Sequence, residues 1–186
     1  MILNLFVYCL LPALISCAVN WEDCGQADRS LVFHKINFKS DAIVIDGHKP
    51  IEAEVDFSVL DPFDYEVTMS AELRRYFSIL GIKSSVKIPC INDAGSCSGP
   101  FCYFVQSYSN LARSFADQLH VPFDCAIEKG RYKGNITYPI PTNVFNKIPT
   151  VISNNLSGKY ELVIRWYFGD QEAGCLAIGS ALQINP

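Results

Sequence analysis

The sequence predicts an all-β fold, an immunoglobulin-like sandwich with one short helix that disulfide bonds fasten together. Three observations lead to this prediction. Several segments alternate apolar and polar residues with a period of two, turn signals separate these segments, and six cysteines follow residue 18. Many short strands with one helical segment are typical of a two-sheet sandwich and not of a βαβ protein.

The chain begins with an apolar leader. Residues 1–18 carry no charged side chain and end in Ser16, Cys17 and Ala18, small residues that suit signal peptidase. We expect a secretory signal that is cleaved after Ala18. A membrane anchor is the alternative, because the run is barely long enough to cross a bilayer. Residues 19–186 then form a single domain, which is long enough to bury its own core.

Five segments carry the pattern of strands. Residues 31–38 are β-branched and aromatic, and residues 159–168 and 175–184 are strand-like segments joined by a Gly169-Asp170 turn. In residues 51–60, one face carries apolar side chains and the other carries Glu52, Glu54, Asp56 and Ser58. In residues 64–73 the expected inward side chains are Tyr65, Val67, Met69, Ala71 and Leu73.

One segment changes the period. Between Cys102 and Cys125, apolar residues recur at every third or fourth position, which places them on one face of a helix: Phe104, Tyr108, Leu111, Phe115 and Leu119. We expect one short helix here.

The cysteines indicate an exported, oxidised protein. Cleavage leaves an even number of them, and Cys90 and Cys97 flank an Asn-Asp-Ala-Gly loop that allows the two sulfurs to meet. Gly95-Ser96-Cys97-Ser98-Gly99 also matches a nucleophile-elbow spacing, but that motif needs a parallel α/β sheet. The cysteine and histidine spacings do not favour a metal site, so we predict neither a metal nor a cofactor. We expect Cys90 and Cys97 to form a structural disulfide.

Four motifs in one order resemble a known family. They are W-x-x-C at Trp21–Cys24, KIPC…GSC…FC at 87–102, C-x-x-x-K-G-x-Y at 125–132 and GCLAI at 174–178. Together they resemble the MD-2-related lipid-recognition (ML) family, and most of all its ganglioside activators. The resemblance implies a sandwich opened into a cup, with an apolar cavity for lipid chains. It also implies the pairings Cys24–Cys175, Cys90–Cys97 and Cys102–Cys125.

The chain departs from the activators at two places. It lacks both cysteines of a fourth disulfide, and Phe123 stands in the place of one of them. The segment 147–158 lacks the tryptophan that the activators carry there, and Val151 and Ile152 are the nearest apolar substitutes. The resemblance therefore gives less support to membrane insertion by this segment.

The resemblance suggests which side chains would line the cavity. On the residues alone, a closed sandwich in which they form ordinary core is the stronger interpretation, whereas the likeness favours a cavity lined by some of them. The candidates are Val55, Phe57, Val59, Val67, Met69, Leu162, Ile164 and Trp166.

A second apolar segment suggests a rim for the cup. Residues 76–82 place Phe77, Ile79, Leu80 and Ile82 around Gly81, where the family has a mobile apolar loop. The alternative is a strand that is buried on both faces.

These features predict a non-enzymatic lipid-binding and lipid-transfer protein. We expect it to take a glycosphingolipid or a phospholipid from a membrane surface, which it contacts transiently, and to present it to a lysosomal β-hexosaminidase-like glycosidase. The alternative is a carrier or sensor of sterols or other apolar ligands. The net charge of −4 and the scattered basic residues speak against a nucleic-acid partner. The sequons at Asn135 and Asn155 predict glycosylation, consistent with the secretory pathway and a lysosomal or extracellular destination.

Overall fold

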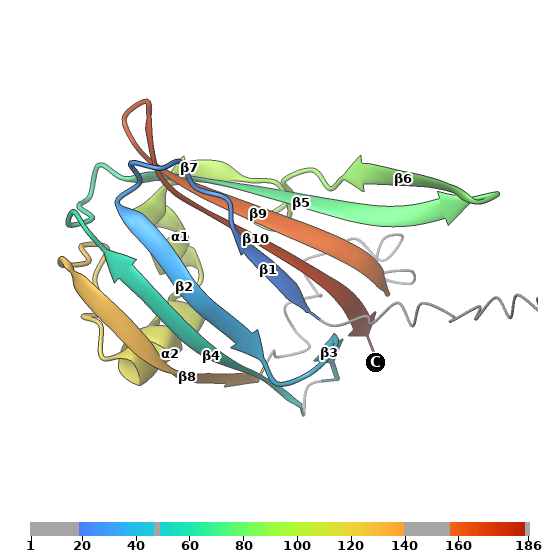
Figure 1. Cartoon of the computed structure of the whole chain (residues 1–186), viewed down its shortest axis with the longest axis horizontal. Coiled ribbons are helices and arrows are strands. Elements are labelled where there is room, and N and C mark those ends of the chain that lie inside the picture. Colours follow the sequence, from blue (N-terminus) through green and yellow to red (C-terminus); the bar gives the residue numbers. More distant parts are fainter. Residues whose placement is uncertain (1–18, 47–48, 140–156, 185–186) are drawn as a thin grey trace, which may run out of the picture.

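Two β-sheets face each other in a sandwich (Figure 1). The structure is a computed structural model that describes residues 19–46, 49–139 and 157–184, and within these ranges it has ten strands and two helices. The expected signal at 1–18, Val151, Ile152 and Asn155 lie outside the described residues. The predicted all-β class is confirmed.

The larger sheet has the strand order β1-β10-β9-β5-β6, and β3 and β7 pair with β10 and β5 respectively. Its pairings are antiparallel except that of β3 with β10. The long strands β5, β9 and β10 correspond to the alternating segments of the sequence. The strands span β1 Asn20–Asp23, β3 Ile43–Ile45, β5 Thr68–Ile79, β6 Ile82–Lys87, β7 Ser98–Pro100, β9 Gly158–Phe168 and β10 Gln171–Ile184.

The smaller sheet has the order β2-β4-β8, with strands β2 Leu31–Phe38, β4 Pro50–Val59 and β8 Gly130–Pro139. The alternation expected in β4 is confirmed, because its acidic residues pair across strands with cations on one face. Lys39 contacts Glu52, Lys35 and Lys133 contact Glu54, and Arg131 contacts Asp56. The apolar residues of β4 therefore point to the opposite, inner face.

The segment expected to be one helix forms two, α1 Phe101–Ser107 and α2 Ser109–Leu119. Tyr108 lies between them with φ −112° and ψ 38°, outside the helical region. Its hydroxyl donates a hydrogen bond of 2.6 Å to the carbonyl oxygen of Asp93, a long-range contact that the spacing could not reveal. Phe104 and Leu119 are buried as expected, whereas Tyr108 and Phe115 are more than one third exposed.

The expected strand at 64–73 begins later than its alternation suggested. Asp64 caps a turn, because its side chain accepts a hydrogen bond from the Glu66 amide and its carbonyl accepts one from Val67. Tyr65 is consequently 64% exposed instead of facing inward, and its hydroxyl bonds Asp124. Strand β5 starts at Thr68.

The buried core lies at one end of the sandwich, which we call the core end. It joins both sheets through a contact between the rings of Phe33 and Trp166, whose centroids are 5.9 Å apart. The buried residues of this cluster are Leu31, Ile36, Val59, Phe63, Val67, Trp166, Ala173 and Leu176.

Three disulfides occur in the described ranges, and they are the pairs that the resemblance implied: Cys24–Cys175, Cys90–Cys97 and Cys102–Cys125. Cys97 is therefore bonded and cannot act as the nucleophile that its flanking glycines suggested. Neither of the described helices is long and apolar enough to span a membrane.

Candidate functional site

Apolar rows continue along the inner face of the larger sheet beyond the core. The register aligns Ile164 with Ala71 and Leu176, and the next inward row aligns Leu162 with Leu73 and Ile178. These rows share the face of Trp166, because residues two apart on a strand point the same way. Except for Leu176, their members are only partly buried. The inner face of this sheet is thus fully covered at the core and incompletely covered beyond it.

The smaller sheet presents a matching apolar face. Phe33 pairs with Phe57, and Phe57 in turn contacts Tyr132 at a centroid distance of 5.3 Å. Val55 and Phe38 lie further along the same inner face. All five side chains are partly buried. The two faces diverge from the core end toward the end that contains Gly158 and the last residues of β5 and β10, which we call the open end (Figure 1).

The structure divides the eight candidate cavity residues into two groups. Val59, Val67 and Trp166 lie in the buried core. Partly exposed on the two inner faces are Val55, Phe57, Met69, Leu162 and Ile164.

Sequence reasoning missed several inward side chains: Trp21, Phe33, Phe38 and Ile178. In β2 a bulge between Phe33 and Lys35 shifts the register, so the inward residues there do not follow a period of two. Trp21 lies in a strand too short to show a period, although it pairs with Ile178 on β10.

The inner face becomes polar at the open end. The row after Leu73 and Leu162 contains Arg75, Tyr160 and Ser180, aligned across β5, β9 and β10. The Arg75 guanidinium lies over the Tyr160 ring at 5.9 Å from its centroid, and its Nη2 donates to the Ser157 carbonyl at 3.2 Å. Burial raises the pKa of the Tyr160 hydroxyl, which stays neutral at physiological pH.

A groove of about 820 Å³ lies at this end of the larger sheet. Its walls come from five strands, and Phe77, Tyr160 and Ser180 are among its lining residues, together with Asn20, Lys83 and Glu161. The Tyr76 hydroxyl at its side donates a 2.6 Å hydrogen bond to Glu161, which raises the pKa of Tyr76. Tyr76 and Glu161 alternate with Arg75 and Leu162 along β5 and β9, so these groove side chains belong to the outer face of the sheet, and Arg75 is not among the lining residues.

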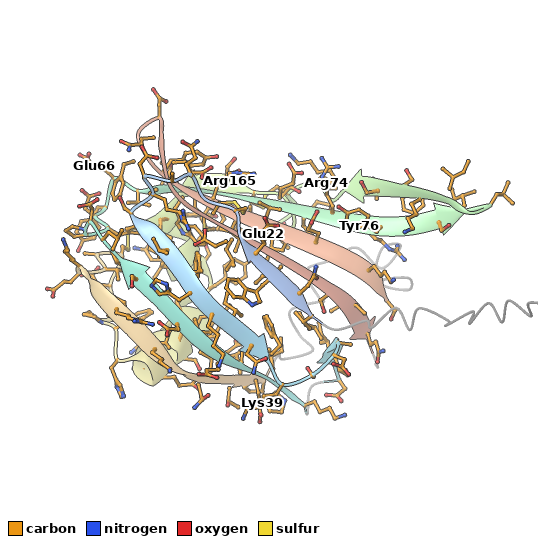
Figure 2. All side chains as sticks on the ribbon, viewed as in Figure 1. Glu22, Lys39, Glu66, Arg74, Tyr76 and Arg165 are labelled. Atoms are coloured by element: carbon orange, nitrogen blue, oxygen red, sulfur yellow. A yellow bond between two sulfur atoms is a disulfide. The ribbon has the colours of Figure 1, made fainter. Side chains whose placement is uncertain are left out.

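Strands β5 and β6 extend past the rest of the larger sheet as a hairpin (Figures 1 and 2). The predicted rim residues lie at its end, with Phe77 39%, Ile79 61%, Ile82 73% and Leu80 99% exposed. This exposure excludes the alternative of a strand buried on both faces. Leu80 and Gly81 form the two-residue turn, with φ of 50° and 84°.

Leu80 is an unfavourable residue for that turn. Two positive φ angles favour Asn, Asp or Gly, and the left-handed conformation costs other residues about 1–2 kcal/mol. A leucine there is both strained and exposed to water, so it does not stabilise the turn.

The outer faces of both sheets are polar. Arg131 donates two 2.8 Å hydrogen bonds to Asp56, and they hold the pKa of that carboxyl below its usual value. Hydrogen bonding to Lys35 likewise lowers the pKa of Glu54. The predicted glycan acceptor Asn135 pairs with Glu54 on this outer side of β8 and is exposed. Figure 2 shows the side chains of Arg74 and Arg165 on the larger sheet, which pair with Glu72 and Glu172.

Comparison with known proteins supports the resemblance seen in the motifs. The chain is 26% identical over 174 residues to the ganglioside GM2 activator of Mus musculus, which covers 88% of this chain and 81% of that protein. No family model matches the chain. The predicted resemblance to the ganglioside activators is confirmed.

Solved structures give weaker likenesses. A Niemann-Pick type C2 protein from the Japanese carpenter ant aligns with 88% of this chain and 99% of its own, at 12% identity and a TM-score of 0.43. A sporulation control protein from Bacillus subtilis aligns with 84% of this chain and 50% of its own, at 8% identity and a TM-score of 0.33.

Proposed function

We propose that this chain is a non-enzymatic lipid-binding protein that takes a glycosphingolipid or related lipid from a membrane and presents it to a hydrolase. One observation carries the proposal. Apolar side chains on the two facing sheets stay partly exposed next to a small buried core, among them Val55, Phe57, Met69, Leu162 and Ile164. The similarity to the ganglioside GM2 activator supports the same function.

The energetics of hydrocarbon transfer suit this arrangement. Moving an acyl chain from an apolar environment into water costs about 0.8 kcal/mol of free energy for each CH₂ group. Moving from a bilayer to an apolar space between sheets exchanges one such environment for another and is nearly neutral. The protein would therefore exchange lipid at a membrane and retain it between membranes.

The hairpin tip supplies the membrane contact in this proposal. Leu80, Ile79 and Ile82 are the most exposed apolar side chains of the hairpin, and burying a leucine in an apolar medium contributes about 1.5–3 kcal/mol. Contact would be transient, since a few side chains cannot anchor a protein permanently. The contribution of Val151 and Ile152 to this rim is part of the same hypothesis.

The partner in this scheme is a glycosidase of the β-hexosaminidase type. The protein would lift the headgroup clear of the bilayer, and the hydrolase would do the chemistry. The predicted secretory signal, the disulfides and the exposed Asn135 sequon support export to a lysosome or the extracellular space.

Identification of the bound lipid tests this function. The protein would be purified from a eukaryotic secretion host without detergent, extracted with organic solvent and analysed by mass spectrometry. We expect a two-chain lipid, at about one molecule for each protein. A sterol would instead support the alternative of an apolar-ligand carrier, and a protein that neither carries nor takes up any lipid would contradict the proposal.

A further inference from the structure

Arg75 places a positive charge on the inner face of the larger sheet. It follows Leu73 by two residues on β5, and the pairing of β5 with β9 is regular from Thr68 to Tyr76. Arg75 therefore points to the same side as the apolar rows, one row closer to the open end. Its neighbours in this row are the ring of Tyr160 and the small Ser180.

Within the residues that the structure describes, Arg75 has no carboxylate partner. Four of the arginines form ion pairs with acids: Arg29 with Asp23, Arg74 with Glu72, Arg131 with Asp56 and Arg165 with Glu172. Every Asp and Glu of the sequence lies in the described ranges, and none of them forms an ion pair with Arg75. The charge of Arg75 is thus not neutralised by any acidic side chain of the protein.

The guanidinium is nevertheless held in place. It stacks on Tyr160, and its hydrogen bond to the Ser157 carbonyl uses one of its five N–H donors. Gly158 leaves room for it, because a Cβ there would lie 3.3 Å from the Arg75 Nε. A planar, oriented fork of donors matches the oxygens of a phosphate or a carboxylate.

We propose that Arg75 binds the anionic oxygen group of a lipid headgroup, a phosphate or a carboxylate, while the hydrocarbon chains cover the apolar rows of Leu162 and Ile164. This inference rests on the proposed function and adds the ligand class to it. The order of rows along β5 and β9 matches the order of parts in such a lipid, with hydrocarbon toward the core and charge toward the open end.

The alternative is that Arg75 only packs on Tyr160 and ties the base of the hairpin to Ser157. A structural role of this kind would affect all lipids equally, whereas an anion site would affect only those with a charged headgroup. The decisive quantity is therefore the difference in affinity between two lipids with identical chains.

The experiment measures how tightly dioleoyl phosphatidylglycerol and uncharged dioleoylglycerol bind to the purified protein. Each lipid is titrated against a fluorescent lipid that competes for the same apolar site. The variants are Arg75→Gln, Arg75→Lys and the control Arg113→Gln. Arg113 is matched to Arg75, because it also stacks on an aromatic ring, at 4.5 Å from the Phe123 centroid, but lies on α2. Both glutamine variants lower the net charge equally.

We expect wild-type protein to prefer phosphatidylglycerol, and Arg75→Gln to lose about 10- to 100-fold in its affinity for that lipid alone. Arg75→Lys keeps the charge without the fork and should lose several-fold, while Arg113→Gln should bind like the wild type. Arg75→Lys also decides the question if Arg75→Gln does not fold.

Three results would overturn the inference: equal losses for both lipids, no loss for either, or the same loss in Arg113→Gln. Competition by glycerol 3-phosphate at concentrations comparable to the lipid would overturn the assignment to a lipid headgroup and indicate a free anion instead. Failure of the wild type to bind either lipid would contradict the proposed function itself, which the other outcomes leave intact.

Discussion

At Gly95 the backbone takes a conformation that a side chain would obstruct. Its φ is +102°, and a Cβ would overlap the carbonyl oxygen of Pro89 across the Cys90–Cys97 loop. Gly169 also has a positive φ, +56°, but a Cβ there would meet nothing within 4 Å. Substitutions at the two glycines therefore separate the cost of a positive φ from the cost of a steric clash with neighbouring backbone.

Gly169→Ala should lower the free energy of unfolding by about 1–2 kcal/mol, the cost of a left-handed residue. Gly95→Ala should lower it by at least about 1 kcal/mol more, because the neighbouring backbone must also move. Urea unfolding of the oxidised proteins measures both. Equal losses of unfolding free energy in the two variants would mean that the loop around Gly95 moves to accommodate the added Cβ without measurable cost.

The ion pair between Asp56 and Arg131 should make stability depend on pH. Because the pKa of Asp56 is lower in the folded protein than in the unfolded chain, its contribution is complete above about pH 5 and is lost as the pH falls below about 4. Glu54 acts in the same direction. The outer face of the smaller sheet should thus keep its ion pairs in a mildly acidic compartment.

Asp56→Asn should therefore lower stability at pH 6 and reduce the fall in the free energy of unfolding between pH 6 and pH 3. Asp117→Asn, at an exposed position of α2, serves as the control. Urea unfolding at the two pH values gives the comparison. A pH dependence as steep in Asp56→Asn as in the wild type would contradict the assignment.

At the scale of the elements, the hairpin of β5 and β6 carries the strongest prediction. Leu80→Asp places a charge at the tip, and it should weaken binding to phosphatidylcholine vesicles containing phosphatidylglycerol by about tenfold or more. The urea midpoint should stay the same or rise, because Asp suits the left-handed turn position better than Leu. Co-sedimentation measures binding. Leu60→Asp provides a matched control, because Leu60 is 44% exposed immediately after β4.

Loss of secretion or of the folded state in Leu80→Asp would contradict a role for Leu80 that is confined to membrane contact. Retained vesicle binding in the folded variant would remove the hairpin from the membrane contact.

Most of the long strands could be predicted from the sequence, but the ten-residue β8 was not among them, and the smaller features could not be predicted. β2 and β4 agree closely with the segments 31–38 and 51–60, because a strand with one wet face repeats every two residues. The strands β1, β3 and β7 have only three or four residues, too few to show a period. The break between α1 and α2 depends on the distant contact of Tyr108 with Asp93.

The sequence predicted which residues of the candidate site point inward, but not how deeply each of them is buried. Leu162 and Trp166 lie on the same face of β9 and have the same periodic signal, yet Trp166 is buried and Leu162 is not. Depth depends on how far the two sheets diverge, which is a property of tertiary packing. Arg75 escaped notice because a pair of arginines is typical of a solvated strand end, although one further step of the alternation through Ala71 and Leu73 places it on the inner face.

At the scale of the whole molecule, the question is whether the space between the sheets accepts hydrocarbon. Leu162→Trp enlarges a side chain on the inner face, and Val163→Trp enlarges its neighbour on the opposite face. In a cup, Leu162→Trp should reduce bound lipid several-fold and leave stability nearly unchanged. In a solid core it should lower the free energy of unfolding by about 1–3 kcal/mol. Lipid extraction and urea unfolding of both variants distinguish the two cases.

The disulfides all attach near the core end. Cys175 follows Gly174, which pairs with Trp166; the Cys97 carbonyl accepts from Ala71; and the residue before Cys102 bonds Val67. Strand β9 therefore runs from the open end, which has no nearby disulfide in the described residues, to the core end, which the disulfides hold together. In deuterated water, the amides of β9 near Trp166 should exchange slowly and those near Gly158 rapidly. The strand would then be rigid at the core end and mobile at the open end, and the far ends of the two sheets would be able to move apart.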